Sequence, residues 1–237
     1  MVDLPAATGP VPALYAAPPG RPRGVLVMLT GGDGDIGIQA DGSLRHPDNF
    51  LIRTRDLWLA HGYAVLIPDA PGGDNLRGAR STTAFATWVA SLASFAHAQS
   101  SAPVFLVGTS QGSIAAMNGA AHVDGLAGVV LTESVSRLGG SHETVFDADP
   151  AAVRIPALVV ANRDDRCRVA PPEDAPRIAT ALSNTPDVRV LTVNGGEQRS
   201  RDDCGSLTPH GYYGIEIKVI DGIVAWLDVH GERPIGP

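Results

Sequence analysis

Residues 104–117, Val-Phe-Leu-Val-Gly-Thr-Ser-Gln-Gly-Ser-Ile-Ala-Ala-Met, decide the fold of this chain. The first four are apolar and strand-favouring, and the stretch from Ser113 onward is typical of a helix. Between them stands the pattern G-x-S-x-G. A serine on a tight strand-to-helix turn projects its hydroxyl from the sheet, beside a helix N-terminus that favours negative charge. The segment therefore predicts a parallel α/β sheet with Ser110 as a candidate nucleophile.

Steric crowding in the turn explains why the pattern has glycine at both of its ends. Gly108 and Gly112 lie two residues before and two after the serine, where the turn brings them together and a Cβ atom would clash. An ordinary turn that matches five residues by chance is the alternative. The strand before the pattern and the helix after it favour the nucleophile.

Short β-branched runs alternate with longer amphipathic segments along all 237 residues. This order is typical of βαβ units and predicts one α/β domain, 1–237, with a mostly parallel central sheet and helices on both faces. We expect strands at 11–16, 24–30, 64–68, 104–108, 128–132, 157–161 and 188–193, with an antiparallel entry into the sheet at its beginning. We expect helices at 49–61, 82–97, 110–121, 173–182 and 213–230.

Charge and hydropathy exclude two classes of partner. The net charge is −7, and Lys218 is the only lysine beside scattered arginines, so a basic face for nucleic acid is not expected. The apolar runs are far shorter than the ~18–20 residues of a membrane-spanning helix. The first twenty residues lack the pattern of a secretion signal.

The irregular segments 31–48, 70–81, 163–172 and 194–211 follow the predicted strands. In an open parallel sheet, ligands bind outside the carboxyl ends of the strands. We therefore expect a site built from these loops. The alternative is that they are surface loops without a site.

With these motifs, residues 11–227 resemble the α/β-hydrolase superfamily. In that family a serine, an acid and a histidine follow in this order. The resemblance implies Asp165 as the acid, with Asp164 close behind and Glu133 as a further candidate after an earlier strand. It implies His210, which precedes the last amphipathic segment, as the base. A surface charge at 165 and an exposed loop histidine at 210 are the simpler alternatives.

The same resemblance implies an oxyanion hole, formed by two backbone N–H groups that bind the negative oxygen of a tetrahedral intermediate. One donor is Gln111, and the other is Gly32, with Asp33 as its alternative. The chain has Gly31 and Gly32 where the family usually has His-Gly, which leaves the second donor open.

Residues 32–37 also match G-x-G-x-x-G, the dinucleotide-binding pattern. We reject this interpretation because Asp33 and Asp35 would repel a pyrophosphate, and no helix follows directly. A calcium loop starting at Asp33 fails because its sixth residue is Ile38 and its twelfth is Leu44. We expect no metal and no cofactor.

The resemblance implies a serine hydrolase that cleaves a small ester-type acyl substrate through an acyl-enzyme intermediate. An acyltransferase with the same three residues, or a non-catalytic binding protein of the same fold, stays open.

Only about twenty residues separate the strands at 128–132 and 157–161, so no large cap is expected. Segments 31–48 and 70–81 would then cover the site. Arg77 and Arg80 would meet an anionic substrate group, although solvated surface side chains are the simpler interpretation. The oligomeric state stays open.

Cys167 and Cys204 are the two cysteines of the chain. The first follows Asp165 closely and the second precedes His210. A working site brings these loops together, so the thiols are candidates for one disulfide, with chance placement as the alternative. A disulfide would indicate the periplasm or secretion, and two free thiols the cytoplasm.

Overall fold

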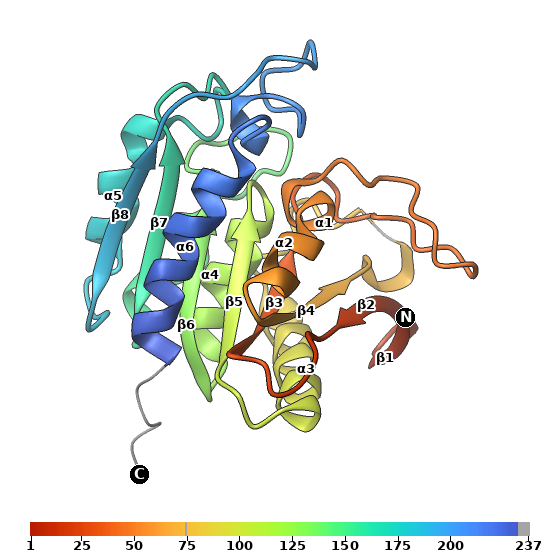
Figure 1. Ribbon diagram of the computed structural model, residues 1–237. Helices are drawn as coiled ribbons and strands as arrows, with labels where there is room; N and C mark the ends of the chain where they lie inside the picture. The colour runs from red at the N-terminus through yellow and green to blue at the C-terminus, as the bar shows by residue number, and fades with distance from the viewer. Residues whose placement is uncertain (74, 232–237) are drawn as a thin grey trace.

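A computed structural model of the protein describes residues 1–73 and 75–231. Its centre is a sheet whose eight strands in the described residues follow the order β1-β2-β4-β3-β5-β6-β7-β8 (Figure 1). The strands β4-β3-β5-β6-β7-β8 pair parallel with one another, whereas β1 pairs antiparallel with β2 and β2 pairs antiparallel with β4. The expected mostly parallel sheet is confirmed. The strands are β1 (Val2–Ala6), β2 (Gly9–Ala16), β3 (Gly24–Leu29), β4 (Tyr63–Pro68), β5 (Val104–Thr109), β6 (Leu126–Thr132), β7 (Ala157–Asn162) and β8 (Val188–Val193).

The sheet begins with a hairpin that the sequence analysis recognised only in part. Strand β1 was not expected, because Pro5 interrupts its short apolar pattern. Here Pro5 lies on an edge strand, where a missing N–H is tolerated, and Gly9 makes the turn with a φ of 110°. Strand β2 pairs with β4 and not with β3, so the antiparallel entry into the sheet runs through β4.

Helices cover both faces of the sheet, as expected (Figure 1). On one face, Val89 of α3 and Ile114 of α4 pack with Leu106 in one apolar cluster, which α5 also joins. On the other, Trp226 of α6 packs on Phe105, together with residues of α1 and α2. The helices are α1 (Phe50–Arg53), α2 (Arg55–Ala60), α3 (Thr83–Gln99), α4 (Gly112–His122), α5 (Ala175–Ala181) and α6 (Glu216–Gly231).

All five expected helices differ from the prediction in their bounds, and for three of them the structure shows a local reason. The expected helix at 49–61 is two helices, which meet at Thr54, whose hydroxyl donates to the Phe50 carbonyl. Helix α4 begins at Gly112, because Ser110 has a left-handed backbone. Helix α6 begins three residues later than expected, because Tyr212 and Gly214 have positive φ angles of 57° and 86°.

The long loops gather at the carboxyl ends of the parallel strands. Between β6 and β7, residues 133–156 contain only two short 3₁₀ turns, η2 (Val145–Asp147) and η3 (Pro150–Ala152), and no helical cap. Loop 31–48 folds around Asp69, whose carboxylate accepts the N–H groups of Ile36, Gly37 and Ile38 at 2.9, 3.4 and 2.8 Å. None of the helices in the described residues is long and apolar enough to span a bilayer.

A disulfide joins Cys167, in the loop after β7, to Cys204, in the loop after β8, as predicted. The two Cα atoms lie 4.6 Å apart, and the cysteines are 37 positions apart in the sequence. The second loop is long and polar, so it buries little apolar surface of its own. The disulfide therefore ties it to the sheet edge.

We predict that the double variant Cys167→Ser/Cys204→Ser unfolds more easily than the wild type. The crosslink limits the unfolded chain, which is worth up to ~4 kcal/mol for a loop of this length. Chemical denaturation measures the difference. A reducing agent should lower the stability of the wild type and leave the double variant unchanged; two free thiols in natively prepared wild-type protein would contradict the prediction.

Candidate functional site

Ser110 lies on the sharp turn between β5 and α4. Its φ is 51°, in the left-handed region that non-glycine residues rarely adopt. Its N–H donates to the carbonyl of Thr132 at 2.9 Å, which anchors the turn to β6. A Cβ atom on Gly108 would lie 2.3 Å from the Gly112 carbonyl, and one on Gly112 would lie 1.9 Å from the Leu29 carbonyl. Both glycines are therefore required by close backbone approach, as the sequence analysis proposed.

Three of the predicted site residues lie in one chain of hydrogen bonds. His210 Nε2 is 3.0 Å from Ser110 Oγ, and His210 Nδ1 is 2.7 Å from Asp165 Oδ2. The side chain of Asp165 is fully buried, and that of His210 is 4% exposed. Since the buried carboxylate accepts at Nδ1, that nitrogen carries hydrogen and Nε2 of the neutral ring is free to accept from the serine.

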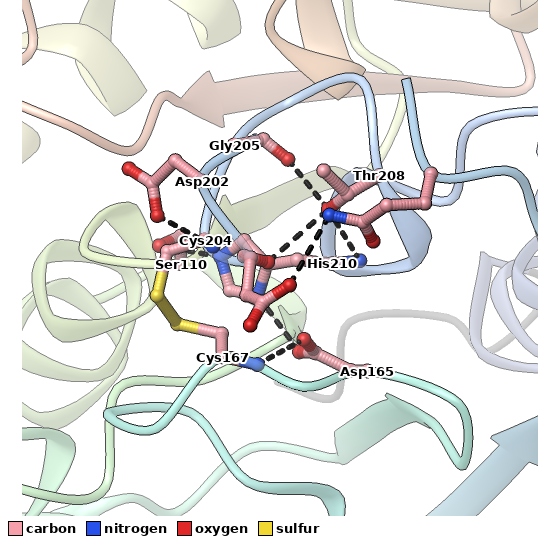
Figure 2. Close-up of a disulfide and its surroundings, with 10 residues drawn as sticks. Ser110, Asp165, Cys167, Asp202, Cys204, Gly205, Thr208 and His210 are labelled. Atoms are coloured by element: carbon pink, nitrogen blue, oxygen red, sulfur yellow. Dashed lines mark hydrogen bonds and ion pairs between the residues drawn. A yellow bond between two sulfur atoms is a disulfide. The ribbon is translucent and has the colours of Figure 1, made fainter. Parts of the chain in front are cut away.

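Local backbone contacts hold the acid and the histidine. The N–H of Cys167 donates to Asp165 Oδ1 at 2.7 Å, so the disulfide begins two residues from the carboxylate it supports (Figure 2). The N–H of His210 donates to the Thr208 hydroxyl at 3.1 Å. Figure 2 shows Cys167, one end of the disulfide, next to Asp165. The Asp165 carboxylate is thus held from two sides, by the backbone of Cys167 and by the ring of His210.

Two supporting residues were missed by the sequence analysis. Asn162, fully buried at the end of β7, donates to the carbonyls of Gly195 and Pro209, both at 2.9 Å. Arg53 donates to the carbonyl of Gly211 and pairs with Glu216 at 3.1 Å. Burial lowers the pKa of Arg53, and the charge of Glu216 opposes this shift. A polar residue at a strand end is a weak signal for Asn162, whereas nothing in the sequence indicates the long-range contacts of Arg53.

The other two acid candidates occupy different environments. The Asp164 side chain is 47% exposed, and its Oδ2 accepts the N–H of Gly195 at 2.7 Å. Glu133 is 1% exposed and lies beside Asp165. The carboxylate that hydrogen-bonds to His210 Nδ1 is that of Asp165 and not that of Glu133. Burial, and next the charge of Asp165, raise the pKa of Glu133 well above its ordinary value.

Glu133, Asp165 and His210 also form the one group of His, Cys, Asp and Glu side chains, within the described residues, whose potential metal ligands all lie within 4.8 Å of each other. The ring nitrogen and the carboxylate of this group already hydrogen-bond each other at 2.7 Å. A metal ion would have to break that bond. The donor set therefore fits a proton-transfer group better than a metal site.

The predicted oxyanion-hole residues lie beside the serine. A Cβ atom on Gly31 would lie 2.9 Å from Ser110 Cβ, so the loop after β3 passes directly against the turn. With its amide oriented so that both ends are satisfied, Gln111 donates to the Gly32 carbonyl and accepts from Arg77, both at 3.2 Å. Gly32 has a φ of 63° and, together with Asp33, lines a cavity of about 380 Å³.

The interpretation of Arg80 as a solvated surface side chain is wrong. Arg80 is 1% exposed, and its guanidinium Nη2 lies 3.4 Å from the Thr30 carbonyl, next to the loop after β3. Burial lowers its pKa to about 10, against the opposing charge of Glu143. Arg80 lines a small cavity together with Thr30, Phe85 of α3 and Ala115 of α4. The apolar spacing alone did not indicate these surroundings. Arg77 is exposed, as expected.

Comparison with solved structures supports the fold. The chain is similar to a zinc-bound cold-adapted esterase from an Arctic intertidal metagenomic library, with a TM-score of 0.65 and 16% identity over 98% of this chain and 92% of that one. It is similar to a dienelactone hydrolase from Anabaena variabilis, with a TM-score of 0.64 and 16% identity over 98% of this chain and 97% of that one. It is also similar to a monoacylglycerol lipase from Paleococcus ferrophilus, with a TM-score of 0.61 and 16% identity over 93% of this chain and 99% of that one.

No protein-family model and no curated protein matches the sequence. The sequence identity to these three structures is 16%, so the similarity shows the fold of this chain and nothing about its activity. The chain has the α/β-hydrolase fold, as the G-x-S-x-G segment and the order of serine, acid and histidine predicted.

We predict that Gly112→Ala destabilises the protein by about 3 kcal/mol or more, because the new methyl group would collide with backbone that cannot move freely. Gly140→Ala is the matched control: no heavy atom lies within 4 Å of a Cβ there, so a change within about 0.5 kcal/mol is expected. Thermal or chemical denaturation of both variants measures the difference. Equal stability of the two variants would refute the close approach at Gly112.

Proposed function

We propose that this protein is a serine hydrolase that cleaves a small ester-type acyl substrate through an acyl-enzyme intermediate. The observation that carries the proposal is the chain of hydrogen bonds from the half-buried Ser110 Oγ to His210 at 3.0 Å and from His210 to the buried Asp165 at 2.7 Å. A serine hydroxyl is a weak nucleophile near neutral pH, and a base within hydrogen-bond reach, itself oriented by a third group, is what activates it.

In the first half-reaction, Ser110 Oγ forms a bond to the acyl carbon while its proton moves to His210 Nε2. The carbonyl oxygen becomes negative and accepts hydrogen bonds from the backbone N–H groups of Gln111 and Gly32. The bond to the leaving alcohol then breaks, and His210 gives its proton to that oxygen. Asp165 holds the ring and stabilises its positive charge.

In the second half-reaction, water takes the place of the alcohol. His210 accepts a proton from the water, whose oxygen bonds to the acyl carbon, and returns a proton to Ser110 as the acyl–serine bond breaks. The products are an acid and an alcohol, and the serine is regenerated. His210 must be neutral to accept a proton in either half-reaction.

The cavity lined by loop 31–48, whose first residue, Gly31, lies against Ser110, supports a small, polar substrate. It has a volume of about 380 Å³ and is lined by charged side chains from loop 31–48, including Asp35, Arg45 and Asp48. Charged walls lose solvation against a long alkyl chain, so short or polar acyl groups fit better. The disulfide supports an oxidising compartment as the place of action.

We predict that Ser110→Ala abolishes turnover of a panel of esters that varies in acyl length and charge, because the change removes the attacking oxygen and little else. Within the panel, short and polar acyl groups should be cleaved fastest by the wild type. The control is the folded state of the variant, checked by circular dichroism. A folded Ser110→Ala protein that keeps more than a trace of wild-type turnover would refute Ser110 as the nucleophile.

We predict that Asp165→Asn lowers kcat by up to ~10⁴, because an amide favours the wrong tautomer of the histidine. Asp164→Asn is the matched control one residue away: its carboxylate is half exposed and accepts from the backbone of Gly195. That variant should keep most of its activity. Steady-state kinetics compares the two, and equal losses at both positions would mean that Asp165 is not the acid.

A further inference from the structure

Glu133 is a buried carboxyl group beside the proposed triad that the mechanism above does not use. It follows β6 directly and has a left-handed backbone with a φ of 43°. Its N–H donates to the Val160 carbonyl at 3.1 Å, and its Oε1 accepts the N–H of Asn162 at 2.9 Å. Glu133 therefore connects the ends of β6 and β7, at the base of the loop that carries Asp165.

The second oxygen of this carboxyl group, Oε2, is buried and has no partner at normal hydrogen-bond geometry in the described part of the chain. None of the ion pairs between described residues includes Glu133. An ionised Glu133 would be a buried charge without a counter-ion, next to the carboxylate of Asp165. Both conditions are costly, and a proton on Oε2 removes both.

The titratable groups that face Glu133 are Asp165, His210 and Tyr212. Burial first, and then the charge and hydrogen-bonding capacity of Asp165, raise the pKa of Glu133 well above its ordinary value. The hydroxyl of Tyr212 opposes this shift, but it donates its hydrogen to the Val160 carbonyl at 3.2 Å. A neutral Glu133 therefore has a hydrogen to donate, and the neighbouring acceptor is Asp165.

Asp165 has room for this third hydrogen bond. Its Oδ1 accepts from the backbone of Cys167 and its Oδ2 from His210. An ionised carboxylate offers about four acceptor sites, so a further donor competes with neither. We propose that Glu133 is a positioning residue. It keeps a proton on Oε2 and donates a hydrogen bond through this proton to Asp165, and this bond keeps the acid of the proposed triad ionised and directed at His210. This inference rests on the proposed function.

Two variants of Glu133 test whether the hydrogen-bonding groups of this side chain are needed. Glu133→Gln is neutral and offers both an N–H to Asp165 and an oxygen to Asn162, whereas Glu133→Met fills similar space with neither. We expect Glu133→Met to lower kcat/KM about tenfold or more, because a hydrogen bond to a charged group is lost. Glu133→Gln should restore most of the activity. A glutamine variant as impaired as Asp165→Asn would make Glu133 itself the acid and overturn the inference.

The pH profile tests the charge state of Glu133. If Glu133 is neutral, Glu133→Gln changes no charge, and the acid limb of kcat/KM against pH stays where it is. If Glu133 is ionised, the substitution removes a negative charge near His210, which makes the protonated ring less stable. The acid limb would then move to lower pH, and that result would contradict the inference.

Infrared difference spectroscopy tests the proton without any substrate. At about pH 8, where ordinary carboxyl groups are ionised, the wild type minus Glu133→Gln difference should contain the C=O absorption of one protonated carboxyl group. That absorption should shift in Asp165→Asn, because its hydrogen-bond acceptor changes. Absence of the absorption would overturn the inference. Its presence in a protein that cleaves no ester would instead reject the proposed function and leave the protonated Glu133 standing.

Discussion

The hydrogen bond between Asp165 and His210 is the interaction on which the arrangement of the site depends. It joins the loop after β7 to the loop after β8, and both side chains are almost completely buried. A buried carboxylate is costly unless every neighbouring donor is in place. The chain supplies these donors from the backbone of Cys167 and from the ring of His210. The loops must therefore be held together, or the charge loses its partners.

Several contacts provide that restraint from different directions. The disulfide joins the two loops covalently, Asn162 donates to the carbonyls on either side of the histidine loop, and Arg53 fixes the backbone after His210. The serine is held separately, through the bond from its N–H to Thr132 and the close approach of Gly112 to Leu29. The histidine ring meets a serine whose position is set by β3, β5 and β6. The geometry is thus built into the sheet before a ligand arrives.

The sequence predicted most of the sheet and three members of the site because their signals are local. Alternation of strand and helix patterns is visible in single segments, and the turn at Ser110 needs glycines at fixed positions. The disulfide could be predicted because each cysteine is close in sequence to a candidate residue. Strand β1 was missed for a local reason, because Pro5 interrupts its pattern although its partner β2 follows directly. Arg80 and Arg53 could not be predicted, since their contacts with Thr30 and Glu216 reach segments far away in the sequence. The burial of Glu133 has the same origin: the end of β6 is covered by the loops after β7 and β8 only once the chain has folded.

Covalent labelling tests most directly whether Ser110 is an activated nucleophile and not merely a serine on a tight turn. A fluorophosphonate probe bonds covalently to an activated serine, and mass spectrometry of the intact and digested protein locates the adduct. We expect one adduct per chain, on Ser110, formed by the wild type under native conditions. A folded protein with no adduct, or with its adduct on another residue, would contradict the account.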